Sequence, residues 1–265
     1  MRYIIVMLAA GALCASCEKE LDFHYHDVAP QLVIEGCVTD EGTSVALTRT
    51  TPMDEPMNPA KITDAAVRLT DVTAGETKSL QPDASGIFTD ATPGIVGHEY
   101  RIDVATGGQT YTSTSIMRQH SEICGVEFQW IKMPYDHVAV LQVSFTDPSS
   151  AGDYYWVRLY RNGEAYKWSV LDDSRAVDGI INEVLMTSRM DIDEEDDNTV
   201  LLDGDVVTVT VSAVSREMAD YLEALQSDSN GPCMFSGSFC LGYFLASPVA
   251  ESEIVFRPDQ MGVAG

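Results

Sequence analysis

Histidine, cysteine and carboxylate side chains are the groups that could do chemistry in this chain of 265 residues. None of its five histidines falls in the H-E-x-x-H spacing that places two zinc ligands and a base on one helix. The sequence also lacks the G-x-S-x-G turn of serine hydrolases and the glycine-rich loop that holds phosphates. Because catalysis needs groups at fixed positions, we predict that the protein is not an enzyme. The histidines are His24, His26, His98, His120 and His137.

An acidic run at residues 191–198, with the sequence DIDEEDDN, is the strongest candidate for a ligand site. Hard cations such as Ca²⁺ prefer several carboxylate oxygens, which this run supplies. It lacks the turn glycine and the closing glutamate of an EF-hand loop, and consecutive like charges are also typical of a solvated loop. Both interpretations stay open. The calcium hypothesis assigns the ion to Asp191, Asp193, Asp196 and Asp197.

Cys17 is the cysteine with the most informative surroundings, because two small residues and a short apolar run precede it. Arg2 and the apolar run at 4–13 give residues 1–16 the layout of a secretory signal peptide, too short to cross a bilayer as a helix. We therefore predict cleavage before Cys17 and a diacylglyceryl group plus an amide-linked acyl chain on it, which would anchor the protein to a membrane. The alternative is an ordinary secreted protein in which Cys17 is a plain thiol.

Residues 17–30 are polar, lack periodicity and end in a proline, so we expect a tether behind the lipid. Lys19, Glu20 and Asp22 resemble the short signals of Lys and acidic residues that send lipoproteins of the Bacteroidota to the outer face of the outer membrane. They predict an outer-membrane protein exposed at the cell surface, and a solvated tether is the alternative. The formal net charge of −25 disfavours binding to nucleic acid or to an anionic lipid surface.

Four cysteines remain after the signal peptide and Cys17, and four cysteines allow three pairings. Disulfides persist in an oxidising cell envelope. We predict a bond between Cys233 and Cys240, which bracket a short segment with a glycine available for its turn. Cys37 and Cys124 are expected to be buried free thiols.

Apolar and polar residues alternate along most of the chain after residue 30, as they do in strands with one buried face. Residues 31–117 contain about seven short strands of this kind, which predicts an antiparallel β-sandwich. Gly107-Gly108 predicts a tight hairpin turn, because glycine adopts positive φ angles without a steric cost.

Residues 118–258 keep the strand pattern, and we expect a second antiparallel β domain there, followed by a tail at 259–265. Asn162-Gly163 is a strong hairpin signal between two of its strands. The stretch 172–205 is long and acidic and is expected to be a loop.

One helix is expected in this second domain, at residues 215–227. The Ser215 hydroxyl can cap its first turn. Met218, Leu222 and Leu225 recur at the spacing of one helix face, so we expect this face to be buried.

Taken in order, short segments of the sequence resemble the Bacteroidota lipoprotein family called domain of unknown function 4249. The family has no established activity. The resemblance implies an N-terminal module like the immunoglobulin-like or transthyretin-like modules of bacterial envelopes, and a partner among the TonB-dependent outer-membrane transporters. The segments are Cys17-Glu18-Lys19-Glu20, Leu32-Val33-Ile34-Glu35-Gly36, Tyr111-Thr112-Ser113, Phe145-Thr146-Asp147-Pro148, Tyr154-Tyr155, Leu159-Tyr160-Arg161-Asn162-Gly163, Gly204-Asp205-Val206-Val207, the 215–227 helix and Gly242-Tyr243-Phe244.

Together these features predict an outer-membrane lipoprotein that binds a ligand or a partner without catalysis, as an accessory of a TonB-dependent transporter. A structural or adhesive module of the cell envelope is the alternative. A third hypothesis is a hydrolase in which two of the abundant carboxylates meet in a cleft and act as acid and base.

Overall fold

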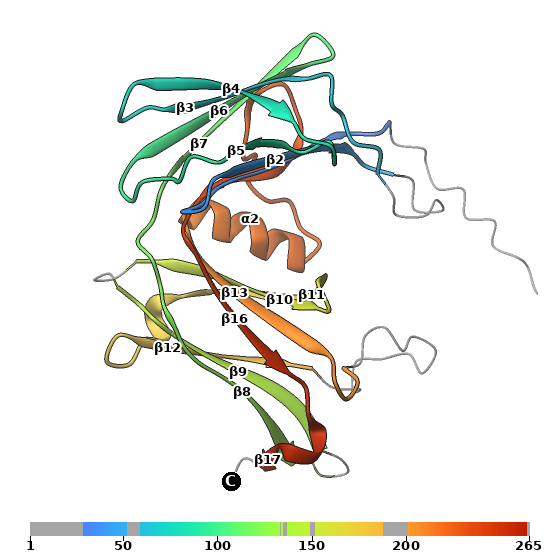
Figure 1. Ribbon diagram of the computed structural model, residues 1–265, viewed down its shortest axis with the longest axis vertical. Coiled ribbons are helices and arrows are strands. Elements are labelled where there is room, and N and C mark those ends of the chain that lie inside the picture. Colours follow the sequence, from blue (N-terminus) through green and yellow to red (C-terminus); the bar gives the residue numbers. More distant parts are fainter. Residues whose placement is uncertain are drawn as a thin grey trace, which may run out of the picture.

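Two β lobes stack along the long axis of the molecule, with one helix between them (Figure 1). The computed structural model describes residues 29–51, 59–132, 134, 137–148, 152–187 and 201–263. Over these ranges the chain forms three sheets and one α-helix, α2 (Arg216–Gln226), so the expected mostly-β fold is confirmed. None of the helices found there is long and apolar enough to span a membrane.

The first lobe is built on a nine-stranded sheet. Its strands are β1 (Leu32–Val38), β2 (Thr43–Arg49), β3 (Ala66–Asp71), β4 (Glu76–Pro82), β5 (Phe88–Asp90), β6 (Glu99–Thr106), β7 (Gln109–Ile116), β14 (Ser236–Gly237) and β15 (Leu241–Ala246). They pair in the order β14-β7-β6-β3-β4-β5-β2-β1-β15, and only the pairing of β1 with β15 is parallel. The sheet folds over on itself, so that a Cβ added at Gly36 of β1 would lie 3.6 Å from Ile102 of β6.

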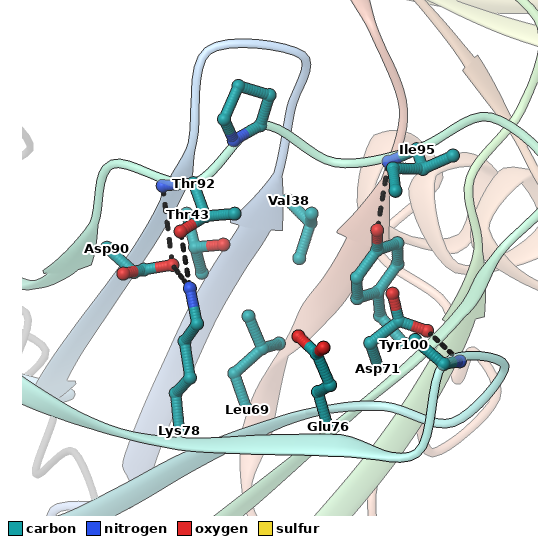
Figure 2. Close-up of a pocket in the computed structure, with 12 residues that line it drawn as sticks. Val38, Thr43, Leu69, Asp71, Glu76, Lys78, Asp90, Thr92, Ile95 and Tyr100 are labelled. Carbon is teal, nitrogen blue, oxygen red and sulfur yellow. Dashed lines mark hydrogen bonds and ion pairs between the residues drawn. The ribbon is translucent and has the colours of Figure 1, made fainter.

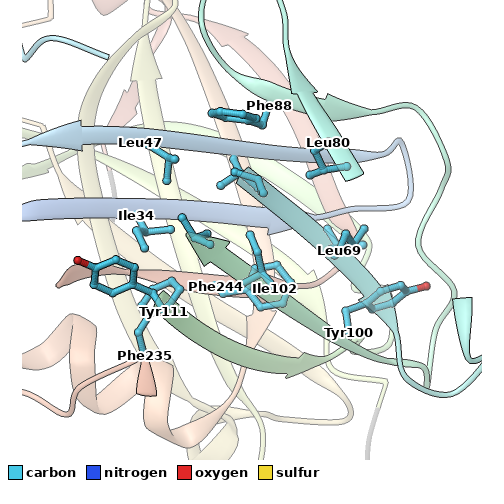
Figure 3. Close-up of a cluster of buried hydrophobic side chains, with 14 of the residues drawn as sticks. Ile34, Leu47, Leu69, Leu80, Phe88, Tyr100, Ile102, Tyr111, Phe235 and Phe244 are labelled. Atoms are coloured by element: carbon cyan, nitrogen blue, oxygen red, sulfur yellow. The ribbon is translucent and has the colours of Figure 1, made fainter. Parts of the chain in front are cut away.

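Every second side chain of β1 and β6 enters the core of the first lobe. Ile34 of β1 and Ile102 of β6 are fully buried, and Figure 3 shows them among the side chains of the opposing layers. Each large apolar side chain buried in this way contributes about 1.5–3 kcal/mol to folding. The apolar residues that alternate with polar ones in the sequence are therefore the residues that fill the space between the two layers of the sandwich.

The C-terminal part of the chain returns to this lobe. β14 pairs with β7 at one edge of the sheet, and β15 pairs with β1 at the other. Phe235 and Phe244 enter the core beside the earlier strands (Figure 3). We expected residues 118–258 to form a second domain alone, but the strand pairing places residues 236–237 and 241–246 in the first lobe. The β pattern was visible in the sequence, whereas the sheet to which each strand belongs was not.

Gly242 lets β15 lie against β1. Its φ angle is +100°, and a Cβ at this position would lie 2.0 Å from the carbonyl oxygen of Ile34. That oxygen belongs to the backbone of a buried strand and cannot move aside cheaply. A residue with a side chain at position 242 would therefore separate the two strands.

The second lobe is a sandwich of two four-stranded sheets, ordered β11-β10-β13-β16 and β12-β9-β8-β17. Edge-to-face ring pairs join the two layers, with 5.0 Å between the ring centroids of Phe145 and Tyr155 and between those of Phe128 and Phe256. The strands are β8 (Ile123–Lys132), β9 (His137–Thr146), β10 (Tyr154–Arg161), β11 (Glu164–Asp172), β12 (Ile180–Met186), β13 (Val206–Val214), β16 (Val249–Val255) and β17 (Gly262–Val263). Short 3₁₀ helices cover Asp173–Arg175 and Pro258–Gln260.

The expected loop at 172–205 contains a strand, β12, which pairs with β9. Its inward face is interrupted by Glu183, which is buried and lies 3.2 Å from the guanidinium of Arg175. Its outward face carries the apolar side chains Val184 and Met186. A charged residue thus points inward and apolar residues point outward, so β12 lacks the usual alternation of buried apolar and exposed polar residues. The prediction of a loop was therefore wrong for β12.

Both predicted hairpin turns are confirmed. Asn162 and Gly163 between β10 and β11 have φ angles of 51° and 88°. Gly107 and Gly108 between β6 and β7 have φ angles of 57° and 74°. Two successive positive φ angles match the right-handed twist of the strands that the turn connects.

The predicted helix is confirmed as α2, and its cap forms as expected, with the Met218 N–H donating to Ser215 Oγ at 3.1 Å. Met218 and Leu222 are buried, but Leu225 is exposed. The expected burial of Leu225 was therefore wrong, because the alanines Ala219 and Ala224 complete the buried face instead.

α2 joins the lobes through an apolar cluster that both of them share. Trp156 of β10 packs against α2 and against Leu245 of β15. The Trp156 ring also meets the ring of Tyr243 edge to face at 5.5 Å, and the guanidinium of Arg158 lies 4.4 Å from its centroid. The helix therefore lies between the β11-β10-β13-β16 sheet of the second lobe and β15 of the first lobe (Figure 1).

Asp205 anchors the β10–β11 hairpin to the start of β13. Its carboxylate accepts hydrogen bonds from Arg161 Nε at 2.7 Å, Asn162 Nδ2 at 2.8 Å and the Leu202 N–H at 2.7 Å. Burial alone would raise the pKa of Asp205, but these three donors outweigh burial and hold the pKa below its ordinary value of 3.8.

Replacing Gly242 by alanine should destabilise the protein by on the order of 3–5 kcal/mol, because backbone atoms would have to move. Gly97 is the matched control, since its φ is +85° but nothing lies within 4 Å of an added Cβ. Gly97→Ala should cost only about 1 kcal/mol. Urea titration measures both free energies of unfolding, and equal losses would contradict the close approach of β15 and β1.

Replacing Asp205 by asparagine should cost on the order of 2–4 kcal/mol of unfolding free energy at pH 7, because Arg161 loses its buried partner. Since the folded pKa is lowered, this contribution is present above about pH 4 and is lost as the pH falls through the folded value. The difference from wild type should therefore shrink in acid. Asp203→Asn, at an exposed carboxylate, should change stability little at any pH. A difference that does not vary with pH would argue against an ionised Asp205.

Candidate ligand pocket

A pocket of about 170 Å³ opens at one end of the first lobe. The β1–β2 turn, the β3–β4 turn and the β5–β6 connection meet there, and each contributes to its lining (Figure 2). The lining residues are Val38, Thr43, Leu69, Asp71, Ala74, Glu76, Lys78, Asp90, Thr92, Pro93, Ile95 and Tyr100. Because the strands that carry these residues are fixed in the sandwich, the pocket is held by rigid elements.

Its base is apolar, with Val38, Leu69 and the ring of Tyr100 all buried. The Tyr100 hydroxyl accepts a hydrogen bond from the Ile95 N–H at 2.9 Å, which ties the β5–β6 connection to the pocket. Burial raises the pKa of Tyr100, so this phenol stays protonated at neutral pH.

One wall of the pocket is an ion pair between Lys78 and Asp90, with 3.0 Å between Nζ and Oδ2. Lys78 also donates to the Thr92 hydroxyl, and the Thr92 N–H donates to Asp90 at 3.3 Å. Burial would raise the pKa of Asp90, but the bonds from Lys78 and Thr92 outweigh burial and lower the pKa. The lysine is therefore already neutralised by a neighbour.

A second carboxylate, Asp71, is held by His98 and by the β3–β4 turn. His98 Nδ1 lies 2.8 Å from Asp71 Oδ2, and the Ala74 N–H donates to Asp71 Oδ1 at 2.8 Å. Burial opposes ionisation of Asp71, but the bonds from His98 and Ala74 prevail and lower its pKa. Two of the three carboxylates of the pocket thus have partners.

Two polar groups of the pocket have no hydrogen-bond or ion-pair partner within the described part of the chain. Glu76 begins β4, and its exposed carboxylate points into the pocket (Figure 2). Thr43 is only 4% exposed, and its Oγ1 is buried without a partner. A buried hydroxyl without a hydrogen bond is costly, so this position suits a polar group that arrives from outside.

The sequence did not reveal these residues. The lining comes from six strands and two connections, and each of its polar members resembles an ordinary polar residue at or near a strand end. Only the folding of the sheet brings them together. The turn Asp71–Glu76 was the one available signal, because acidic residues on both sides of a tight turn must share one end of the sheet.

The site residues expected from the sequence lie elsewhere. Cys17, Lys19, Glu20 and Asp22 lie outside the described residues, and so do the expected calcium ligands Asp191, Asp193, Asp196 and Asp197. In the ranges that the structure does describe, no group of three or more His, Cys, Asp or Glu side chains is arranged to hold a metal ion. The calcium hypothesis stays a prediction.

All four cysteines beyond the tether are free thiols in the structure. Cys233 and Cys240 both line one pocket beside α2, and their predicted disulfide stays a prediction. Burial, with the Cys233 thiol beside it, raises the pKa of Cys240 to about 11. Burial also raises the pKa of Cys37, which makes this thiol unreactive. Cys124 is exposed, so its expected burial was wrong.

Comparison with known proteins gives a family but no activity. No curated protein matches the chain. Among solved structures, the chain is similar to a DUF4785 family protein from Legionella pneumophila, with 14% identity and a TM-score of 0.23 over 68% of this chain and 51% of that one. The chain thus spans about half the length of that protein, and this likeness is too weak to inform the pocket. The family profile described as Domain of unknown function (DUF4249) matches residues 18–252. The resemblance seen in the sequence is confirmed, and the chain belongs to the DUF4249 family.

Proposed function

We propose that this protein is a non-catalytic binding protein, anchored by a lipid to the outer membrane and exposed at the cell surface. The pocket of the first lobe is the observation that carries this proposal. Lys78 with Asp90, and Asp71 with His98, form bonds that fix its walls, whereas Glu76 and the Thr43 hydroxyl have no partner and face an apolar base. Such a surface, presented by the loops of a rigid sandwich, is typical of recognition.

The position of the pocket supports an anchored protein. The expected tether leads into β1 at Leu32, and the pocket lies at the other end of that strand, at Val38. A lipid on Cys17 would therefore leave the pocket on the side of the lobe that faces away from the tether. A fully extended tether over residues 17–30 would reach roughly 45 Å, enough to hold the lobe clear of the membrane.

A TonB-dependent outer-membrane transporter is the partner that we propose. A lipid anchor would keep the protein at a high local concentration beside such a transporter, so even a weak contact would be populated. In this role the pocket captures or presents a ligand, and the transporter moves it.

The alternative, a structural or adhesive module, has one observation in its favour. β11 and β12 are edge strands of the second lobe, and a groove lies between them. Val184 and Met186 of β12 are exposed beside this groove. An exposed edge with apolar side chains can pair with an extended segment of another protein.

Cross-linking in intact cells followed by affinity capture from detergent-solubilised membranes tests the proposal. Wild-type protein should stay with membranes through a high-salt wash and should capture a TonB-dependent transporter, identified by mass spectrometry. Cys17→Ala should move to the soluble envelope fraction and lose most of the captured transporter, because the local concentration falls.

Two results would contradict the proposal separately. A Cys17→Ala protein that still pellets with membranes would refute the lipid anchor. A wild-type protein that is anchored but captures no transporter would refute the accessory role and favour the structural or adhesive alternative.

A further inference from the structure

The charges of the pocket leave one carboxylate unmatched. Asp90 is paired with Lys78, and Asp71 is hydrogen-bonded to His98, so Glu76 is the carboxylate of the lining that has no partner. We propose that the pocket binds a primary alkylammonium group, which Glu76 neutralises. This inference rests on the proposed binding function and names the class of ligand that the pocket takes.

The same charges exclude an anionic ligand. A carboxylate or phosphate group would enter between Asp71, Glu76 and Asp90, while the one lysine of the lining is already paired. An ammonium ion, in contrast, meets a net negative potential. Its attraction to Glu76 is of the charge-assisted kind, which is stronger than a bond between neutral groups.

Thr43 supplies a second contact. Its hydroxyl is directed toward the middle of the pocket in Figure 2, beside Val38 and Leu69. An alkylammonium group has three N–H donors, and Glu76 uses only part of them. The unpartnered Thr43 Oγ1 is buried at the base of the pocket, and a small rotation of the Thr43 side chain would bring this acceptor to a further N–H.

The apolar lining distinguishes an organic ammonium from a metal ion. Val38, Leu69 and Tyr100 offer carbon surface to an alkyl chain, whereas Ca²⁺ or Mg²⁺ would need oxygen ligands on all sides. The volume of about 170 Å³ is smaller than the ~300–1,000 Å³ of sites for drug-sized ligands. It suits a short aliphatic amine or the end of a lysine side chain.

Ligand-observed NMR titration of the full chain at pH 7 tests this inference with three probes of equal length. n-Butylamine is charged at this pH, 1-butanol is its neutral analogue, and butyrate is its anionic analogue. Butylamine should bind at least tenfold more tightly than butanol, and butyrate should not bind. Equal binding of butylamine and butanol, or tighter binding of butyrate, would overturn the inference.

Glu76→Gln should weaken butylamine binding at least tenfold. Glu164→Gln is a closely matched control, because Glu164 is also an exposed first residue of a strand that follows a turn glycine. It should leave the affinity unchanged. Thr43→Val should weaken binding several-fold while the melting temperature stays the same or rises, since the hydroxyl lacks a partner. Unchanged affinity in both Glu76→Gln and Thr43→Val would place the amine elsewhere.

A fourth probe separates the two sources of the ammonium group. Nα-acetyl-lysine methylamide should bind more tightly than butylamine if the ligand is a lysine of a polypeptide, and less tightly if it is a free amine. Failure of all amines to bind would overturn this inference, while capture of the transporter would still support the proposed function.

Discussion

The close approach of the Gly242 backbone to the backbone of Ile34 is the constraint on which the rest of the structure depends. It allows β15 to run parallel to β1 and to complete the core of the first lobe with Phe244. Parallel neighbours in one sheet need a long connection. Here that connection contains β2 to β7 of the first lobe and then β8 to α2, so the first lobe cannot be complete until the chain has passed through most of the second.

This connection explains how the lobes are held together. After Ala246 the chain passes directly into β16 of the second lobe, and α2 packs Met218 and Leu222 against Trp156 on one side. The shared cluster fixes the lobes at β15, an edge strand of the first sheet. The pocket lies among the turns of that sandwich, where Thr43 and Glu76 are carried by strands rather than by a long loop. Rigid strands can hold a small ligand at fixed distances with little loss of entropy on binding.

Much of the local structure was predictable from the sequence, because it depends on local chemistry. Asn162-Gly163 and the Ser215 cap gave the correct hairpin and helix start. β12 was missed, since Glu183 points inward for Arg175. Beyond the Asp71–Glu76 turn the pocket could not be predicted, because Thr43 and Glu76 line one site only after β4 and β5 link the two halves of the sheet. Long-range pairing leaves no periodic signal in a single sequence.

Native-state hydrogen exchange of β15 tests most directly whether the returning strand belongs to the first lobe. If it does, the amides of β15 and β1 should share one high protection factor and should lose it together with the amides of β16 as urea is added. Exchange of the β15 amides at the rate of an exposed loop, with β1 still protected, would contradict the pairing of β15 with β1.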